Sequence, residues 1–152
     1  MTARVYVAIG ANLGDARAAV LHAMTNLDAL PETRVVARSS LYRSAPVDAT
    51  GPDFINAVVE LETGLEPEPL LRELQRLELG AGRDRPYRNA PRTLDLDLLY
   101  HGDAVMATES LTLPHPRIAE RAFVLLPLAE IASDRVTNAQ LRQVADQRIE
   151  RL

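Results

Sequence analysis

The chain has 152 residues, 47% of them hydrophobic, with no cysteine, no lysine and a formal net charge of -4 at pH 7. This length predicts a single domain spanning residues 1–152. The composition excludes disulfides, thiolate metal sites and lysine-based catalysis, and the acidic balance argues against binding a nucleic-acid polymer. Because no segment matches a membrane span of ~20 apolar residues or a secretory signal, we expect a cytoplasmic protein without membrane partners.

The first half of the chain alternates predicted strands with a predicted helix. Alternating hydrophobic residues predict a strand over residues 4–10. Asp15 is placed to cap a helix that runs to about Leu30, where hydrophobic residues recur at helical spacing. Residues 33–42 and 54–63 are predicted as two further strands, which we expect to pair with each other.

The second half begins with a predicted helix over residues 67–79, whose first turn contains two prolines. A strand follows at residues 93–100, and we expect it to form a hairpin with a short strand near Val105. The tail is predicted to form helices over residues 121–132 and 138–147.

The order of these elements indicates the fold class. A strand, a helix, two strands, a helix and a strand follow one another, which is the ferredoxin-like arrangement. We therefore predict an α+β ferredoxin-like sandwich, a mainly antiparallel sheet with helices packed on it. The core is βαββαβ, and C-terminal helices are added to it.

Two aspartates alternate with leucines in the predicted strand at residues 93–100. The leucines are expected to face the core, so Asp95 and Asp97 project together from the opposite face. Two carboxylates at this spacing repel each other, and Mg²⁺ commonly binds one or two carboxylates together with phosphates and water. A solvated strand face is the alternative, although aspartate is depleted in strands.

Four arginines, Arg83, Arg85, Arg88 and Arg92, precede this strand, and with one aspartate they give the segment a local charge of +3. Guanidinium groups suit bidentate contacts with phosphate. A solvated charge run is the alternative interpretation. Carboxylates that bind metal, next to cationic side chains, are nevertheless the two halves of a nucleoside triphosphate site.

Three further residues or pairs are candidates for ligand binding. His115 lies between two prolines and is either structural or a donor to a phosphate. Phe54 and Asn56 share one face of a predicted strand, where a ring and an amide suit a flat heterocycle. The usual role of Phe54 and Phe123, the two phenylalanines of the chain, is nevertheless to pack in the core.

Residues 88–99, RNAPRTLDLDLL, resemble the signature of the 6-hydroxymethyl-7,8-dihydropterin pyrophosphokinases. Further matching motifs occur in order at residues 9–15, 40–46, 53–57 and 113–116. The resemblance implies transfer of diphosphate from ATP to the hydroxymethyl group of the pterin, with release of AMP, in folate biosynthesis. The alternative is a nucleotide- or RNA-binding module of the same fold without turnover.

The resemblance also implies the role of each site residue. Asp95 and Asp97 would hold two Mg²⁺ ions and, together with Arg83 and Arg92, would be the catalytic residues. The residues implied for ATP binding are Gln75, Glu78, Arg83, Arg85, Arg88, Arg92, Leu98, Thr112, His115 and Arg121. Those implied for pterin binding are Ser44, Ala45, Pro46, Val47, Phe54, Asn56 and Phe123. We expect the enzyme to act as a monomer without a nucleic-acid partner.

Overall fold

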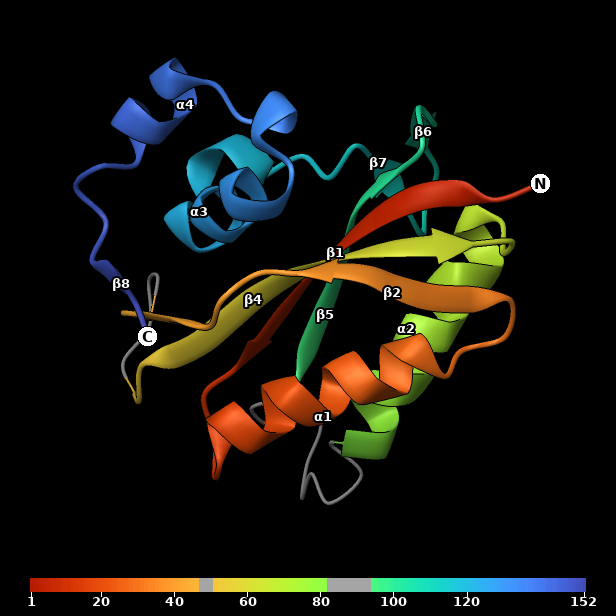
Figure 1. The fold of residues 1–152 in the computed structure, drawn as a ribbon, viewed down its shortest axis with the longest axis horizontal. Coiled ribbons are helices and arrows are strands. Elements are labelled where there is room, and N and C mark those ends of the chain that lie inside the picture. Colours follow the sequence, from red (N-terminus) through yellow and green to blue (C-terminus); the bar gives the residue numbers. More distant parts are fainter. Residues whose placement is uncertain (47–50, 82–93) are drawn as a thin grey trace.

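The computed structural model describes residues 1–46, 51–81 and 94–152 (Figure 1). Its strands are β1 (Ala3–Ala11), β2 (Thr33–Arg38), β3 (Tyr42–Ser44), β4 (Phe54–Thr63), β5 (Asp95–His101), β6 (Met106–Ala107), β7 (Thr112–Leu113) and β8 (Ile149–Arg151). Its α-helices are α1 (Ala16–Asp28), α2 (Pro67–Ala81), α3 (Ala122–Ile131) and α4 (Asn138–Gln143). No helix in the described part of the chain is long and apolar enough to cross a membrane.

Six of the strands form one sheet, in which neighbouring strands follow the order β5, β1, β4, β3 and β8, while β2 also pairs with β4. Every pairing described in this sheet is antiparallel. The order β5, β1, β4, β2 is that expected for a βαββαβ core. The predicted α+β fold is therefore confirmed.

Helices cover both faces of this sheet, with α1 and α2 on one side and α3 and α4 on the other (Figure 1). The first face packs Val7, Ile9, Ala57, Val59, Leu96 and Leu98 against α1 and α2. The second face packs Tyr6, Ala8, Val58 and Leu99 against Leu125 and Leu128 of α3 and Val144. The two-residue alternation of the strands separates these two cores.

Strand β5 contains a bulge opposite β1. Val7 pairs with Leu98 and Tyr6 pairs with Tyr100, so Leu99 is an extra residue in β5. A bulge of this kind shifts the alternation of the residues that follow it. Leu99 is 1% exposed and packs in the second core.

The prediction of one strand over residues 33–42 is wrong, because the chain leaves the ladder between β2 and β3. There the Ser39 hydroxyl accepts a hydrogen bond from the Val58 N–H at 2.9 Å and donates to the Ser40 carbonyl at 2.8 Å. A side chain thus replaces a backbone partner and interrupts the strand.

Two other local predictions are also wrong. The short strand near Val105 does not pair with β5; instead, β6 pairs with β7 in a separate two-stranded sheet. The last helix ends at Gln143 rather than at residue 147, and the chain then extends into β8, which pairs with β3. The second difference depends on β3, a partner strand that is distant in sequence.

Glu130, near the end of α3, joins three parts of the second face. Its carboxylate accepts hydrogen bonds from the Ser40 N–H at 3.0 Å, the Ser40 hydroxyl at 2.8 Å and the Tyr42 hydroxyl at 2.8 Å, and it lies 3.7 Å from the Arg151 guanidinium. Burial acts to raise the pKa of Glu130, but these hydrogen bonds outweigh it and leave the pKa below its usual value. Burial and the bond to Glu130 raise the pKa of Tyr42 to about 12.

We predict that Glu130→Gln lowers the free energy of unfolding by about 1–2 kcal/mol at pH 7, because an amide cannot accept all of these bonds. The pKa of Glu130 is lower in the folded state than in the unfolded state. Its contribution to the free energy of unfolding is therefore complete above the unfolded-state pKa of about 4.3, and it is lost as the pH falls through the folded-state pKa. Urea unfolding at pH 7 and at pH 3 is the measurement. The difference in free energy of unfolding between the variant and wild type should be smaller at pH 3 than at pH 7.

Glu150→Gln is the control for this prediction, since Glu150 forms an exposed ion pair with Arg43 at 3.0 Å. Its effect should stay below about 0.5 kcal/mol. Equal stability of Glu130→Gln and wild type at pH 7 would contradict the role of Glu130.

Candidate active site

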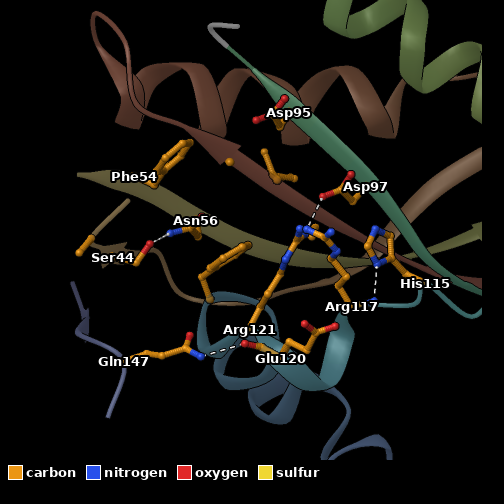
Figure 2. Close-up of a pocket in the computed structure, with 15 residues that line it drawn as sticks. Ser44, Phe54, Asn56, Asp95, Asp97, His115, Arg117, Glu120, Arg121 and Gln147 are labelled. Carbon is orange, nitrogen blue, oxygen red and sulfur yellow. Dashed lines mark hydrogen bonds and ion pairs between the residues drawn. The ribbon is translucent and has the colours of Figure 1, made fainter. Parts of the chain in front are cut away.

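A cavity of about 730 Å³ opens on the second face of the sheet, beyond the part that α3 covers (Figure 2). Strand residues form its floor: Ala8, Ile9, Gly10, Phe54, Asn56, Asp95 and Asp97. Its walls are formed by Ser44, Ala45, His115, Arg117, Glu120, Arg121, Phe123 and Gln147. The face that forms a core under α3 therefore continues as the floor of a binding site.

The two aspartates of β5 line this cavity, as their alternation with leucines predicts. Leu94, Leu96 and Leu98 are 4%, 5% and 3% exposed in the first core, whereas Asp95 and Asp97 point toward the cavity (Figure 2). No group of three or more potential metal ligands occurs among the described residues. A pair of carboxylates on a cavity floor nevertheless fits Mg²⁺, which takes its other ligands from phosphates and water.

Glu78 of α2 supports the backbone between these aspartates. Its Oε2 atom accepts a hydrogen bond from the Leu96 N–H at 2.8 Å. Strand β5 is at the edge of the described sheet, and an edge N–H needs a partner outside the strand ladder. Glu78 therefore fixes the part of β5 that presents the carboxylates.

A flat, partly apolar region adjoins the carboxylates. Phe54 and Asn56 lie on the floor of the cavity, and Phe123 lines its wall. Asn56 is 3% exposed and donates a hydrogen bond to the Ser44 hydroxyl at 2.7 Å. A Cβ atom at Gly10 would lie 3.3 Å from the Asn56 Oδ1 atom, so the glycine keeps the floor free beside this amide.

Arg121 links the carboxylates to the aromatic region. Its guanidinium lies 3.8 Å from the Asp97 carboxylate (Figure 2) and 5.4 Å from the centroid of the Phe123 ring. Both the carboxylate and the ring face favour a cation. The cavity therefore carries a positive charge directly above its floor.

His115 is held as a neutral hydrogen-bond donor. Its backbone N–H donates to the Leu99 carbonyl at 2.9 Å, and its Nδ1 atom accepts from the Arg117 N–H at 3.1 Å. These bonds assign the ring proton to Nε2. Burial lowers the pKa of His115; Asp97 opposes this shift, and Arg121 and Arg117 add to it, which together favour the neutral ring.

The cavity brings together nine of the residues that the sequence predicts: Ser44, Ala45, Phe54, Asn56, Asp95, Asp97, His115, Arg121 and Phe123. Pro46 lines an adjoining cavity of about 150 Å³. Four other predicted residues, Gln75, Glu78, Leu98 and Thr112, are not part of the lining that the described residues form. Val47, Arg83, Arg85, Arg88 and Arg92 lie outside the described residues.

The prediction also missed six residues that line the cavity, namely Ala8, Ile9, Gly10, Arg117, Glu120 and Gln147. Arg117 directly follows the His115 and Pro116 pair, so its position beside a candidate ligand residue was a usable signal. Gln147 had no such signal, because it reaches the cavity from a distant part of the chain.

Comparison with known proteins shows which family the chain belongs to. The family model described as 7,8-dihydro-6-hydroxymethylpterin-pyrophosphokinase (HPPK) matches residues 6–133. A 2-amino-4-hydroxy-6-hydroxymethyldihydropteridine pyrophosphokinase from Pseudomonas aeruginosa is 47% identical over 88% of this chain and 83% of its own. One of the same description from Haemophilus influenzae is 42% identical over 97% of this chain and 96% of its own.

The solved structures support the fold. A crystal structure of Plasmodium falciparum HPPK-DHPS matches 86% of this chain and 42% of its own, with a TM-score of 0.67 and 13% sequence identity. At that identity the likeness bears on the fold alone, and this chain spans less than half of that longer protein. On the family model and the curated relatives together, the chain belongs to the 7,8-dihydro-6-hydroxymethylpterin-pyrophosphokinase family.

Proposed function

We infer that this chain transfers the terminal diphosphate of ATP to the hydroxymethyl group of 6-hydroxymethyl-7,8-dihydropterin in folate biosynthesis, with AMP as the second product. The observation that carries this inference is one cavity in which the carboxylates of Asp95 and Asp97 adjoin the region formed by Phe54, Asn56 and Phe123. Such a cavity suits a ligand that has a flat ring at one end and phosphates at the other.

The aromatic region is the proposed pterin site. Phe54 and Phe123 offer ring faces, and the buried Asn56 offers an amide that Ser44 already orients at 2.7 Å. Offset stacking and edge hydrogen bonds together select a planar heterocycle. The remaining residues proposed to bind the pterin are Ala45, Pro46 and Val47.

The carboxylate region is the proposed triphosphate site, where Asp95 and Asp97 would hold two Mg²⁺ ions. Bound Mg²⁺ would neutralise phosphate charge and polarise the reacting phosphoryl group. Arg121 and the Nε2–H of His115 are proposed to donate hydrogen bonds to phosphate oxygens. The other residues proposed to bind ATP are Gln75, Glu78, Arg83, Arg85, Arg88, Arg92, Leu98 and Thr112.

The reaction is a displacement at the β-phosphorus of ATP. The hydroxymethyl oxygen forms a bond to this phosphorus, the bond from the phosphorus to the bridging oxygen of AMP breaks, and the hydroxyl proton passes to water. Positioning and charge neutralisation are the main demands of such a transfer.

We propose that one monomer suffices for this reaction. Strands β1, β3, β4 and β5, helix α3 and the C-terminal segment of the same chain supply described residues of the cavity lining.

The direct test is to incubate the protein with ATP, Mg²⁺ and 6-hydroxymethyl-7,8-dihydropterin and to separate the nucleotide products. We expect AMP in a one-to-one ratio with the pterin diphosphate, and no ADP. A protein that binds ATP but yields no AMP would be a binding module without turnover, and the proposed function would be wrong.

We predict that Asp97→Asn lowers kcat by at least about 100-fold, because a neutral amide provides weaker electrostatic stabilisation and a weaker metal ligand. Steady-state assays at saturating Mg²⁺ measure this effect. Asp103→Asn is the matched control, since Asp103 is exposed in the turn after β5 and should leave kcat unchanged. Near-wild-type turnover of Asp97→Asn would remove the carboxylate pair from the mechanism.

We predict that Gly10→Ala raises the KM for the pterin roughly tenfold, equivalent to about 1.4 kcal/mol of binding. The new methyl group would lie 3.3 Å from the Asn56 Oδ1 atom and 3.9 Å from the Phe54 ring, so it would crowd the floor beside both. The KM for ATP should change less than twofold. Gly80→Ala is the control, because a Cβ atom there meets nothing within 4 Å, and an unchanged pterin KM in Gly10→Ala would contradict this placement.

A further inference from the structure

The C-terminal segment, residues 144–152, lies outside the part of the chain that the family model matches, which ends at residue 133. Gln147 of this segment nevertheless lines the cavity. The side-chain Oε1 atom of Gln147 accepts a hydrogen bond from the Ala122 N–H at 2.9 Å, and its Nε2 atom donates to the Glu120 carbonyl at 2.8 Å. One amide thus holds the backbone on both sides of Arg121, and Figure 2 shows its bond to the Glu120 carbonyl.

These two bonds serve a helix start that has no local cap. Arg121 is the N-cap residue of α3, and its side chain makes no capping hydrogen bond. The first N–H groups of a helix have no partner within the helix, so Gln147 supplies the acceptor for Ala122. Arg121 itself is extended, with φ -127° and ψ 112°, and its backbone direction decides where its side chain points.

The same C-terminal segment is fastened to the opposite wall of the cavity. Strand β8 pairs with β3 so that Ile149 lies opposite Ser44. The Ala45 N–H donates to the Arg148 carbonyl at 3.3 Å, and the Arg148 guanidinium lies 3.5 Å from the Asp53 carboxylate. Gln147 therefore bridges the wall near Ser44 and the wall that carries Arg121 and Phe123.

We propose that Gln147 is a positioning residue for the diphosphate transfer. Its amide fixes the backbone around Arg121, so that the guanidinium stays at Asp97 and the Phe123 ring stays at the pterin site. The proposal rests on the roles given above to Arg121 and Phe123. The proposal adds a residue from the C-terminal segment to those that position groups in the active site.

The test is Gln147→Met, which keeps the length of the side chain and removes both hydrogen bonds. We expect the KM for the pterin to rise roughly tenfold, while circular dichroism shows an intact fold at the assay temperature. Gln143→Met is the matched control, because Gln143 is exposed at the end of α4. The control should leave the KM for the pterin at the wild-type value.

Gln147→Glu gives a graded comparison, since it keeps an acceptor for Ala122 but loses the donor to Glu120. Its pterin KM should lie between those of wild type and Gln147→Met. A melting temperature lowered by Gln147→Met with an unchanged pterin KM would show a structural role only and overturn the proposal.

Phe123→Ala, assayed in parallel, distinguishes a failure of the positioning role of Gln147 from a failure of the proposed pterin site. If Phe123→Ala raises the pterin KM and Gln147→Met does not, the positioning role is wrong and the site stands. If neither variant changes the pterin KM, the site assignment is wrong as well. In the double variant, the effect of Gln147→Met on the pterin KM should shrink, because coupled residues are not additive; full additivity would overturn the proposal.

Discussion

The two-residue alternation of β1, β4 and β5 is the constraint on which both the core and the site depend. Along each strand, one set of side chains packs against α1 and α2, and the other set faces α3. Because α3 covers only part of that second face, the uncovered positions become the floor of the cavity. The apolar packing that stabilises the fold therefore also fixes the direction of Asp95 and Asp97.

Patterns within one element were sufficient to predict much of this architecture. The alternation of leucine and aspartate in β5 predicted which face carries the carboxylates, and the cavity confirms their placement. The amphipathic helices α1 and α2 and the strands β1 and β4 follow the same local logic. The pairing of Phe54 with Asn56 on one strand face was likewise visible, because residues two apart in a strand share a face.

Features that depend on distant hydrogen bonds could not be predicted in this way. The break between β2 and β3 requires Val58 to donate to Ser39, and β8 exists because β3 offers it an edge. Gln147 reaches the backbone at Ala122, 25 residues earlier, and no spacing rule connects the two positions. Such contacts cannot be recognised in the sequence, because they form only when the fold brings the two segments together.

The bulge at Leu99 divides β5 into two parts, and the alternation of side chains between the two faces of the sheet restarts after it. Before it, Asp95 and Asp97 face the cavity; after it, Tyr100 takes the same face as Tyr6, and the extra Leu99 offers its carbonyl to His115. Because a one-residue slip in a regular strand turns every side chain over, a bulge absorbs such a slip locally. The bulge thereby separates the carboxylates from changes of chain length beyond Leu99, so an inserted or deleted residue in the turn that follows β5 would not turn the aspartates away from the cavity.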